Sequence, residues 1–596
     1  MTVPRPLRRH QRSLAALAAA LARGEAGEVA DILAAVTPGG GKSLLPVIAA
    51  ARLVAAGLVA RVVWVVPRDS LRLQAEEAFA DPVWRAALGH SLAVRAAENR
   101  PDPARGLDGY VTTYQAVAAA PDLHLAEIRR VPTLLVLDEV HHLPVLAEGD
   151  PGAEEAGWSR ALLPLLRHAR LRLLLSGTLE RADGRRILWL PYAAAGPGAR
   201  PLPDLDAPGW AVIGYSRSDA LAERAVLPVS FGALDGEASW LEGGRASEQA
   251  RVGPHRLSAR GATTRPALFT ALRTGFARDL LREAFFATRR LRTARREARG
   301  LPTGEAASGL GKLLVVAPDQ ASAQRYHAML RGWMPPGQAE RDIRLAISDE
   351  PGAHAALAAF RLRPEPAVLV TVAMAYEGLD APEVAVVAAL THIRSRPWLE
   401  QMIARATRVD PHAGDYADQH ALVFHPDDPL FARFRARVEA EQATAPGRRP
   451  PRPVGAANGP VREGPDDGIV PLESNAIGLR YLMLRPRPAA PAPEAEPTPA
   501  APAAVAAPAE PPSRAEDRLR ARVAALVTAQ AAEDAADLRV PRRGGLPHRY
   551  NAVLKRVSGR SRAEMSAAEL EAALDWLERN RLHDHLHLLE GDARYV

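Results

Sequence analysis

Short apolar runs alternate with stretches of helical periodicity in two parts of the chain, residues 1–205 and 301–440. This alternation predicts parallel strands joined by helices, because both faces of a parallel sheet are covered. The candidate strands of the first part are VADILAAV, RVVWVVP, GYVTTY, TLLVLDE and RLLLSGT. Those of the second part are KLLVVAP, RLAIS, AVLVTVAMA, VAVVAAL and HALVFHP. We therefore expect two α/β domains, each built on a parallel sheet.

Between these domains, residues 206–300 are expected to form a connecting segment that ends in an arginine-rich helix. The helical period is marked by four apolar residues that fall on one face, namely Leu268, Leu272, Phe276 and Leu280. The arginine run at 289–300 fits a solvated helix face, which we favour, or a patch that binds nucleic acid.

Beyond the second domain, residues 441–515 are rich in proline and alanine. Such a composition cannot pack a core and predicts an extended, disordered linker, although the apolar stretch IGLRYLML is a candidate for docking elsewhere. Residues 516–596 return to helical periodicity and predict a small α-helical module, which the linker would make separable. The start of its best-marked helix fits a capping box and a hydrophobic staple, formed by Ser566 with Glu569 and by Met565 with Leu570.

Two stretches of this module carry candidate chemistry. Residues 548–562, HRYNAVLKRVSGRSR, interleave Tyr550 with basic residues, which suits either phosphate contacts or a structural module that docks a protein partner. The histidines of HDHLH, residues 583–587, fit a polar helix end better than a metal site, since no carboxylate or cysteine accompanies them at a matching spacing.

Composition narrows the classes of protein. The 596 residues contain no cysteine, which excludes disulfides and thiolate metal sites. A net charge of +7 favours a polyanionic partner. The N-terminal sequence PRPLRRHQRSLAALAAALARGE imitates a signal peptide but fits an arginine-flanked amphipathic helix better. Because no uncharged apolar run reaches the ~20 residues of a membrane span, we expect a soluble bacterial protein of the cytoplasm that contacts no membrane.

The segment AAVTPGGGKSLLPV follows the first candidate strand and is rich in glycine. Its lysine is one of only three in a chain with 76 basic residues, so a compact ammonium is favoured there over a guanidinium. In a phosphate-binding loop, glycines turn backbone N–H groups inward, the lysine reaches the terminal phosphates and the next hydroxyl binds Mg²⁺. The residues in these positions are Gly39, Gly40, Gly41, Lys42 and Ser43. Val36 stands where the strict pattern has a glycine, so the loop taken alone also fits a flexible turn.

A second segment, TLLVLDEVHH, is an apolar strand that ends in Asp138 and Glu139, with His141 close behind. Two carboxylates at the end of a buried strand are costly unless their charge is used. One can hold Mg²⁺ through water while the other polarises the attacking water. A solvated acidic loop is the alternative, but the glycine loop upstream favours an ATPase that uses ATP and Mg²⁺.

Together with further motifs in the same order, these segments make the chain resemble the superfamily 2 DExH-box helicases and translocases. The further motifs are LRRHQ, VVPRDSLRLQ, VTTYQAV, SGT, VAMAYEGLDAPEV and QMIARATR. The likeness covers about residues 5–430 and is greatest to the branch with type I and III restriction motors and DNA-repair helicases. It implies an α/β fold with two tandem RecA-like parallel-sheet domains, followed by the linker and the helical module.

The resemblance also implies roles for individual residues. Residues with catalytic roles would be Asp138, Glu139, Gln401, Arg405 and Arg408. The nucleotide would contact Gln11, which reads adenine, the phosphate loop, Gly378 and Asp380, and Mg²⁺ would be held by Ser43 and, through water, by Asp138. Hydrolysis would be coupled to movement by His141, Ser176 and Thr178. Nucleic acid would contact Pro67, Arg68, Thr113 and Thr371. Ala404 replaces the usual glycine of the last motif, and SGT stands for the usual Ser-Ala-Thr.

The expected function is therefore that of an ATP-dependent helicase or translocase, which hydrolyses ATP to move along or unwind single- or double-stranded DNA in repair, restriction or phage defence. Two alternatives stay open on the sequence alone. One is an RNA-directed DExH helicase, and the other is an ATPase remodeller that nucleic acid stimulates but that separates no strands.

Overall fold

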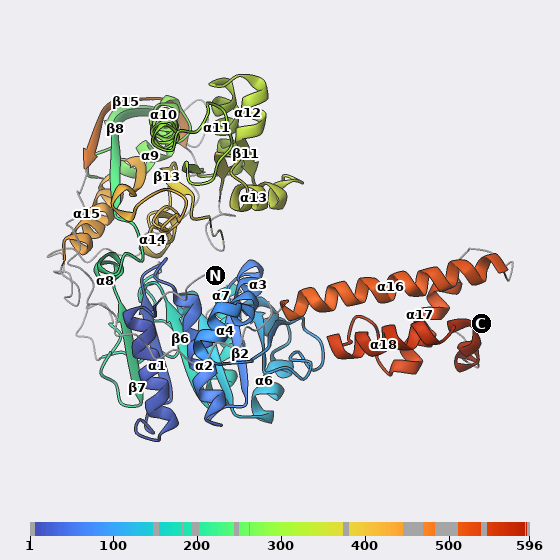
Figure 1. Ribbon diagram of the computed structural model, residues 1–596. Coiled ribbons are helices and arrows are strands. Elements are labelled where there is room, and N and C mark those ends of the chain that lie inside the picture. Colours follow the sequence, from blue (N-terminus) through green and yellow to red (C-terminus); the bar gives the residue numbers. More distant parts are fainter. Residues whose placement is uncertain are drawn as a thin grey trace.

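The computed structural model (Figure 1) shows two α/β domains and a C-terminal group of helices. It describes residues 6–146, 154–181, 183–193, 202–243, 250–261, 263–372, 379, 381–444, 469–482, 510–537, 545–590 and 592. Within these ranges, none of the helices is both long and apolar enough to cross a membrane.

The first domain is built on a seven-stranded parallel sheet with the strand order β3-β4-β2-β5-β6-β1-β7. Its strands are β1 (Asp31–Val36), β2 (Arg61–Val66), β3 (Val94–Ala96), β4 (Gly109–Thr113), β5 (Thr133–Asp138), β6 (Leu171–Ser176) and β7 (Trp210–Tyr215). Every strand predicted in this part of the chain is present. The carboxyl ends of parallel strands meet at one edge of the sheet, which brings together the segments that follow β1, β2, β4, β5 and β6.

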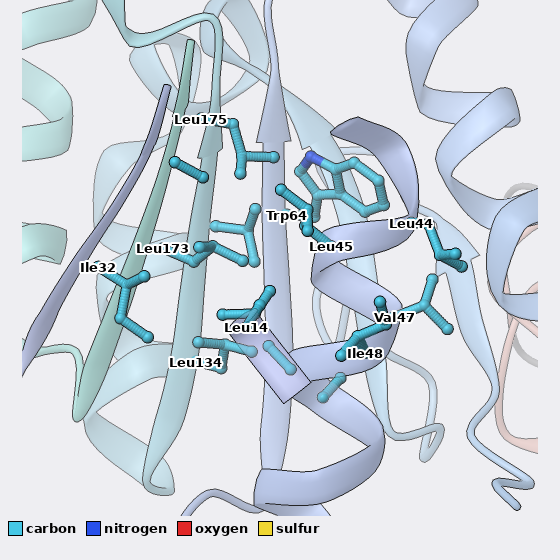
Figure 2. Close-up of a cluster of buried hydrophobic side chains, with 14 of the residues drawn as sticks. Leu14, Ile32, Leu44, Leu45, Val47, Ile48, Trp64, Leu134, Leu173 and Leu175 are labelled. Carbon is cyan, nitrogen blue, oxygen red and sulfur yellow. The ribbon is translucent and has the colours of Figure 1, made fainter. Parts of the chain in front are cut away.

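Helices cover both faces of this sheet. They are α1 (Arg9–Ala22), α2 (Leu45–Ala55), α3 (Asp69–Ala80), α4 (Pro82–Leu88), α5 (Tyr114–Ala119), α6 (Pro121–Arg130) and α7 (Glu154–His168). Alternate strand residues enter opposite cores: Leu134 and Leu173 pack in the cluster of Figure 2 with Leu14 of α1, whereas their neighbours Leu135 and Leu174 belong to the core on the other face. The N-terminal segment is thus an amphipathic helix that packs on α2, as expected.

The second domain is built on eight strands, in the order β11-β12-β10-β13-β14-β8-β15, with β9 also paired to β8. The parallel strands are β8 (Val229–Glu242), β10 (Lys312–Val316), β11 (Ile343–Ala346), β12 (Val368–Thr371), β13 (Val384–Ala389) and β14 (Ala421–Pro426). Its helices are α9 (Thr264–Ala271), α10 (Gly275–Ala298), α11 (Gln320–Gly332), α12 (Pro336–Asp342), α13 (Ala353–Leu362), α14 (Arg396–Ala404) and α15 (Pro429–Ala443). The α/β fold with two RecA-like domains is confirmed.

The segment expected to connect the domains, residues 206–300, contributes to both of them. It supplies β7 to the first sheet, and it supplies β8 and β9 (Ala250–Arg256) to the second sheet. Helix α8 (Arg217–Ala222) lies between β7 and β8 in the chain. The four apolar residues predicted on one helix face are all buried, but they lie on two helices and the turn between them. The second helix begins at Gly275, where a Cβ atom would lie only 2.5 Å from the carbonyl oxygen of Ser474.

A strand also lies within residues 441–515, where the composition predicts a disordered linker. Strand β15 (Ile469–Leu482) pairs antiparallel with β8 along most of its length. The disorder prediction is therefore wrong for this stretch, and the docking expected of IGLRYLML is seen for residues 477–482. The physical reason is that β8 is long and offers backbone donors and acceptors, which a strand can satisfy whatever the composition around it.

The C-terminal module consists of α16 (Pro512–Asp537), α17 (Leu546–Ser558), α18 (Ala567–Arg579) and a 3₁₀ segment, η4 (Leu582–Leu589). These elements share a core of their own. The predicted capping box is present, since Ser566 N donates to Glu569 Oε2 at 2.8 Å and Glu569 N donates to Ser566 Oγ at 3.3 Å. Tyr550 is fully buried and donates to Asp534, so it belongs to the core of the module, while phosphate contacts of the basic residues around it stay a prediction.

Candidate nucleotide-binding site

The glycine loop joins β1 to α2 through a single 3₁₀ turn, η1 (Lys42–Leu44). Gly39 and Gly41 have φ values of +84° and +86°, in the left-handed region that favours glycine. Gly40 N donates to Thr37 O at 2.9 Å, and a Cβ at Gly40 would lie 2.8 Å from that same oxygen. Each of the three glycines is thus needed for the turn, which is a defined structure and not merely a flexible one.

Lys42 lies against the two carboxylates that end β5. Its Nζ is 3.0 Å from Asp138 Oδ1 and also bonds Glu139 Oε1. Burial alone would lower the pKa of Lys42, but the two carboxylates raise it above its ordinary value. Burial would raise the pKa of Glu139, yet Lys42 and His141 hold it well below its ordinary value, whereas burial leaves the pKa of Asp138 raised. Lys42 and Glu139 therefore form a charged pair at neutral pH.

Glu139 is held from the other side by the SGT segment. Gly177 N donates to Glu139 Oε2 at 3.3 Å, and His141 Nδ1 lies 3.3 Å from that oxygen and 3.2 Å from Ser176 Oγ. Burial lowers the pKa of His141, so its contacts to Glu139 and Ser176 are those of a neutral ring at pH 7. Glu139 also has a left-handed φ of +53°, a conformation that costs of order 1–3 kcal/mol for such a residue. This cost is typical of residues that a functional site holds in place.

The SGT segment forms a tight turn in which Ser176 Oγ accepts a hydrogen bond from Thr178 N at 3.2 Å. Glycine in the middle of this turn has a steric cause. A Cβ at Gly177 would lie 2.9 Å from Pro38 Cγ, in the phosphate loop, and 3.5 Å from Gln401 Nε2. The departure from Ser-Ala-Thr thus makes room for a proline in the neighbouring loop.

The second domain reaches this site through α14. Gln401 Nε2 donates to Glu139 Oε1 at 3.1 Å. Arg405 lies behind Gln401 and is buried; it donates to Leu379 O at 2.7 Å and to Gln401 Oε1 at 3.5 Å. Arg408 lies one turn further along and is half-buried. Of the three predicted residues of this motif, Gln401 donates directly to one of the two carboxylates.

Gln11 on α1 contacts the phosphate loop directly. Its Nε2 donates to Gly41 O at 3.1 Å, and its Oε1 accepts from Arg8 N at 2.9 Å. The side chain is almost fully buried. Its expected contact with adenine therefore stays a prediction, while its contact with the loop is observed.

Comparison with known proteins shows a likeness over this part of the chain. Residues 6–181 match the family model described as type III restriction enzyme, res subunit. Because of this likeness, the first domain, which holds the matched residues, is called the res-subunit domain below. The matched residues hold the phosphate loop, both carboxylates and the SGT turn, which meet in one site.

Relatives and solved structures extend over more of the chain. An uncharacterized protein of Mycobacterium leprae is 29% identical over 447 residues, which are 74% of this chain and 65% of that protein. One of Mycobacterium tuberculosis is 28% identical over 422 residues, or 70% of this chain and 62% of the relative, so the chain spans less than two thirds of either. A fragment described as an HsdR subunit of a type I restriction enzyme from Vibrio vulnificus has a TM-score of 0.44 at 15% identity, covering 72% of this chain and 66% of that one. The type ISP restriction-modification enzyme LlaBIII bound to DNA has a TM-score of 0.41 at 13% identity, covering 71% and 28%.

Three of the residues predicted to contact nucleic acid lie at the carboxyl edge of the res-subunit domain. Pro67 and Arg68 follow β2, and the Arg68 side chain is exposed. Thr113 ends β4 and accepts from Ala116 N at 3.1 Å, which caps α5. Thr371, in the second domain, is fully buried, which does not favour a direct contact with nucleic acid. Gly378 and Asp380 lie outside the described residues.

The residues that would hold Mg²⁺ fit that role. Asp138 Oδ1 is buried and takes no directed hydrogen bond from the described residues, although Lys42 Nζ lies 3.0 Å away. Ser43 is exposed beside Lys42, in the 3₁₀ turn η1 that precedes α2. Hydroxyl and carboxylate oxygens are ligands that Mg²⁺ prefers. In the part of the chain that the structure describes, no group of three or more histidine, aspartate or glutamate side chains that could hold a metal ion occurs.

Other charged runs of the sequence are structural. In the 289–300 run, four arginines donate to backbone carbonyls of residues 305–311, namely Arg292, Arg295, Arg296 and Arg299. The ring nitrogens of His585 and His587 face the carbonyls of Arg581 and Asp584, as expected of a helix end. The sequence did not predict the contact between the domains in which Arg396 Nη1 lies 3.2 Å from Glu180 Oε1, beside the SGT turn. No periodicity or motif marks this pair, because its partners are joined only by the fold.

Proposed function

We propose that this protein is a cytoplasmic motor that hydrolyses ATP to move along or unwind DNA. The observation that carries the proposal is the convergence of Lys42, Glu139 and Gln401 on one point between the res-subunit domain and the second domain. A phosphate-loop lysine, a strand-end glutamate and a side chain from a facing domain are the groups that link ATP hydrolysis to domain closure.

In this proposal, the phosphates of ATP would accept hydrogen bonds from the N–H groups of the glycine loop. They would also compete with Asp138 and Glu139 for Lys42. Glu139 would then accept a hydrogen bond from the attacking water. Before ATP binds, Lys42 and His141 hold the pKa of Glu139 low and keep it ionised, and Gly177 N holds its second oxygen in place. Mg²⁺, held by Ser43 and through water by Asp138, would supply charge neutralisation at the terminal phosphates.

Helix α14 would link closure of the second domain onto the first to the hydrolysis of ATP. Gln401 contacts Glu139, and Arg405 is held one turn away against Leu379 O. Arg405 and Arg408 would need to turn toward the γ-phosphate to stabilise its developing charge, an effect worth about 10³–10⁵ in rate in other NTPases. Hydrolysis would then require both domains, and their opening and closing would move bound nucleic acid.

DNA is proposed as the track for two reasons. The net charge of +7 favours a polyanion, and the family matched by the first domain is described as a restriction-enzyme subunit. Exposed Arg68 lies on the same edge of the sheet as the phosphate loop, where a strand bound across both domains would pass.

The test is the ATPase rate of the full chain with no nucleic acid and with single- and double-stranded DNA and RNA. DNA should stimulate hydrolysis most, and the stimulation should weaken with added salt as counterions compete. If RNA stimulates hydrolysis more strongly than DNA does, RNA and not DNA is the track. DNA could also stimulate hydrolysis although the protein neither separates a labelled duplex nor displaces a bound triplex strand. The protein would then be a nucleic-acid-dependent remodeller and not a helicase or translocase.

A further inference from the structure

The C-terminal module is anchored to the res-subunit domain by a buried ionic cluster. Glu516 of α16 accepts from both Arg95 on β3 and Arg105 in the loop that follows β3. The Arg95 contacts are bidentate, with Nη2–Oε2 at 2.9 Å and Nε–Oε1 at 3.2 Å. All three side chains are at most 5% exposed. A carboxylate buried this deeply requires its partners, because an unpaired charge there would be far less stable than in water.

Further hydrogen bonds surround this anchor. Arg105 donates to Met565 O at 2.8 Å and to Ala563 O at 2.9 Å, in the turn before α18. Ser513 N, in the first turn of α16, donates to Glu76 Oε1 at 2.7 Å, and Glu76 is itself buried. Figure 1 shows the resulting arrangement, with one end of the helical module against the first domain. The module is thus docked through two of its segments at once.

The docking site lies on elements next to those that carry the predicted contacts to nucleic acid. Strand β3 is the edge strand of the sheet, next to β4, which ends in Thr113. Helix α3, which holds Glu76, begins directly after Arg68. The loop between β3 and β4 is tied to α5 by a hydrogen bond from Asn99 Nδ2 to Ala116 O at 2.7 Å. These contacts of the module, all made with Glu76, Arg95 and Arg105, involve neither Lys42 nor the carboxylates at the end of β5.

We infer that the docked module buttresses the edge of the first domain that binds nucleic acid, and that Glu516 is the positioning residue of this contact. The inference rests on the proposed function, in which that edge holds the track. The module fixes α3 and the loop after β3 from outside the sheet, so the segments beginning at Pro67 and ending at Thr113 keep their spacing. Loss of docking should therefore weaken nucleic-acid affinity while leaving unstimulated hydrolysis intact.

The experiment uses two full-length variants. Glu516→Arg sets a third arginine beside Arg95 and Arg105, which should expel the module, and Glu516→Gln removes only the charge. Glu510→Arg is the matched control, because Glu510 is an exposed residue of the same segment whose pair with Arg518 lies at the surface. Hydrogen exchange at residues 94–106 and 512–520 reports docking, and melting of the module core reports its folding.

For Glu516→Arg we expect faster exchange at both sites, about tenfold weaker half-saturation by DNA, and unstimulated ATPase within twofold of the wild type. The exchange rates and the half-saturation of Glu516→Gln should lie between those of Glu516→Arg and the wild type. Those of Glu510→Arg should match the wild type. Faster exchange with unchanged half-saturation would overturn the inference, as would unchanged exchange in Glu516→Arg or an equal loss of unstimulated ATPase. Failure of the proposed function looks different: the wild type itself would then show no stimulation by nucleic acid, and the inference would fall with it.

Discussion

Gln401 and Lys42 contact the same oxygen atom, Oε1 of Glu139, although Gln401 belongs to the second domain and Lys42 to the first. The amide donates at 3.1 Å, so the carboxylate is shared between the two domains. When ATP takes Lys42 to its phosphates, Gln401 would stay as a donor to the carboxylate. The position of the second domain is thereby linked to the group that would orient water.

Gln401→Glu should separate the domains at this point, because it sets a second carboxylate against Glu139. Like charges at this distance raise the pKa of one of the pair and disfavour the contact. We expect DNA-stimulated turnover to fall by at least tenfold while nucleotide affinity changes by less than threefold, since Lys42 and the glycine loop are untouched. The control is Gln338→Glu on α12, remote from the site. Wild-type turnover in Gln401→Glu would contradict a role for this contact.

Glu139→Gln keeps the shape and most hydrogen bonds of the side chain but removes its charge. A base of this kind contributes about 10²–10⁴ to the rate, so hydrolysis should fall by that factor while ATP still binds. Lys42→Ala should instead weaken nucleotide binding, because a phosphate partner is lost. Separate measurements of affinity and turnover distinguish the two variants. Hydrolysis near the wild-type rate in Glu139→Gln would refute its assignment.

Gly177→Ala tests the steric cause of the SGT sequence. The added methyl would lie 2.9 Å from Pro38 Cγ, so we expect a loss of about 1–3 kcal/mol in the free energy of unfolding, as for other overpacked sites. The second change Pro38→Ala removes the clashing atom and should restore part of the stability. Gly157→Ala on α7 is the control: nothing lies within 4 Å of its Cβ, and it should stabilise the helix by roughly 0.5–1 kcal/mol. Equal melting of both alanine variants would argue against the clash.

Truncation should separate the role of β15 in the second sheet from that of the docked C-terminal module. A chain that ends at residue 442 loses β15, which leaves β8 with an unpaired edge. Such an edge promotes aggregation, so this truncation should be less soluble and melt earlier than one that ends at residue 509. The longer piece keeps β15 and loses only the docked module, and it should retain unstimulated ATPase. Equal solubility and melting of the two pieces would show that β15 adds no stability.

His10→Phe should reduce the acid sensitivity of the first domain. Burial, aided by Arg8 and Arg9, lowers the pKa of His10 from 6.5 to about 4, and its ring lies 4.0 Å from that of Tyr215. The unfolded chain therefore takes up a proton near pH 6.5 that the folded chain takes up only near pH 4, so stability falls across this window. Phenylalanine keeps an aromatic ring there and cannot be protonated.

Between pH 7 and pH 4, the free energy of unfolding of the wild type should thus fall by up to about 3 kcal/mol more than that of His10→Phe. Denaturant titration at each pH measures this difference. His90 and His124, whose pKa values burial also lowers to about 4, leave a residual pH dependence in the variant. Parallel stability curves for the two proteins would contradict the shift at His10.

Local pattern was enough to predict much of this protein. Ten strands of the two sheets were predicted, and β3, β7, β8, β9 and β15 were not. The predicted strands, the glycine loop, the acidic end of β5 and the capping box at Ser566 each depend on residues that are close in sequence. Periodicity and turn chemistry act over this range, which is why the α/β fold and the two candidate ATP-site segments could be recognised from the chain alone.

Only the tertiary structure decided which distant segments meet. Gln401 and Glu139 are 262 positions apart, and Glu516 and Arg95 are 421 apart. Strand β15 joins the second sheet from within a proline-rich region, and Tyr550 lies in a core and not on a binding surface. Such contacts depend on the complementary burial, charge and unpaired backbone of surfaces that exist only after folding, and no local pattern encodes them.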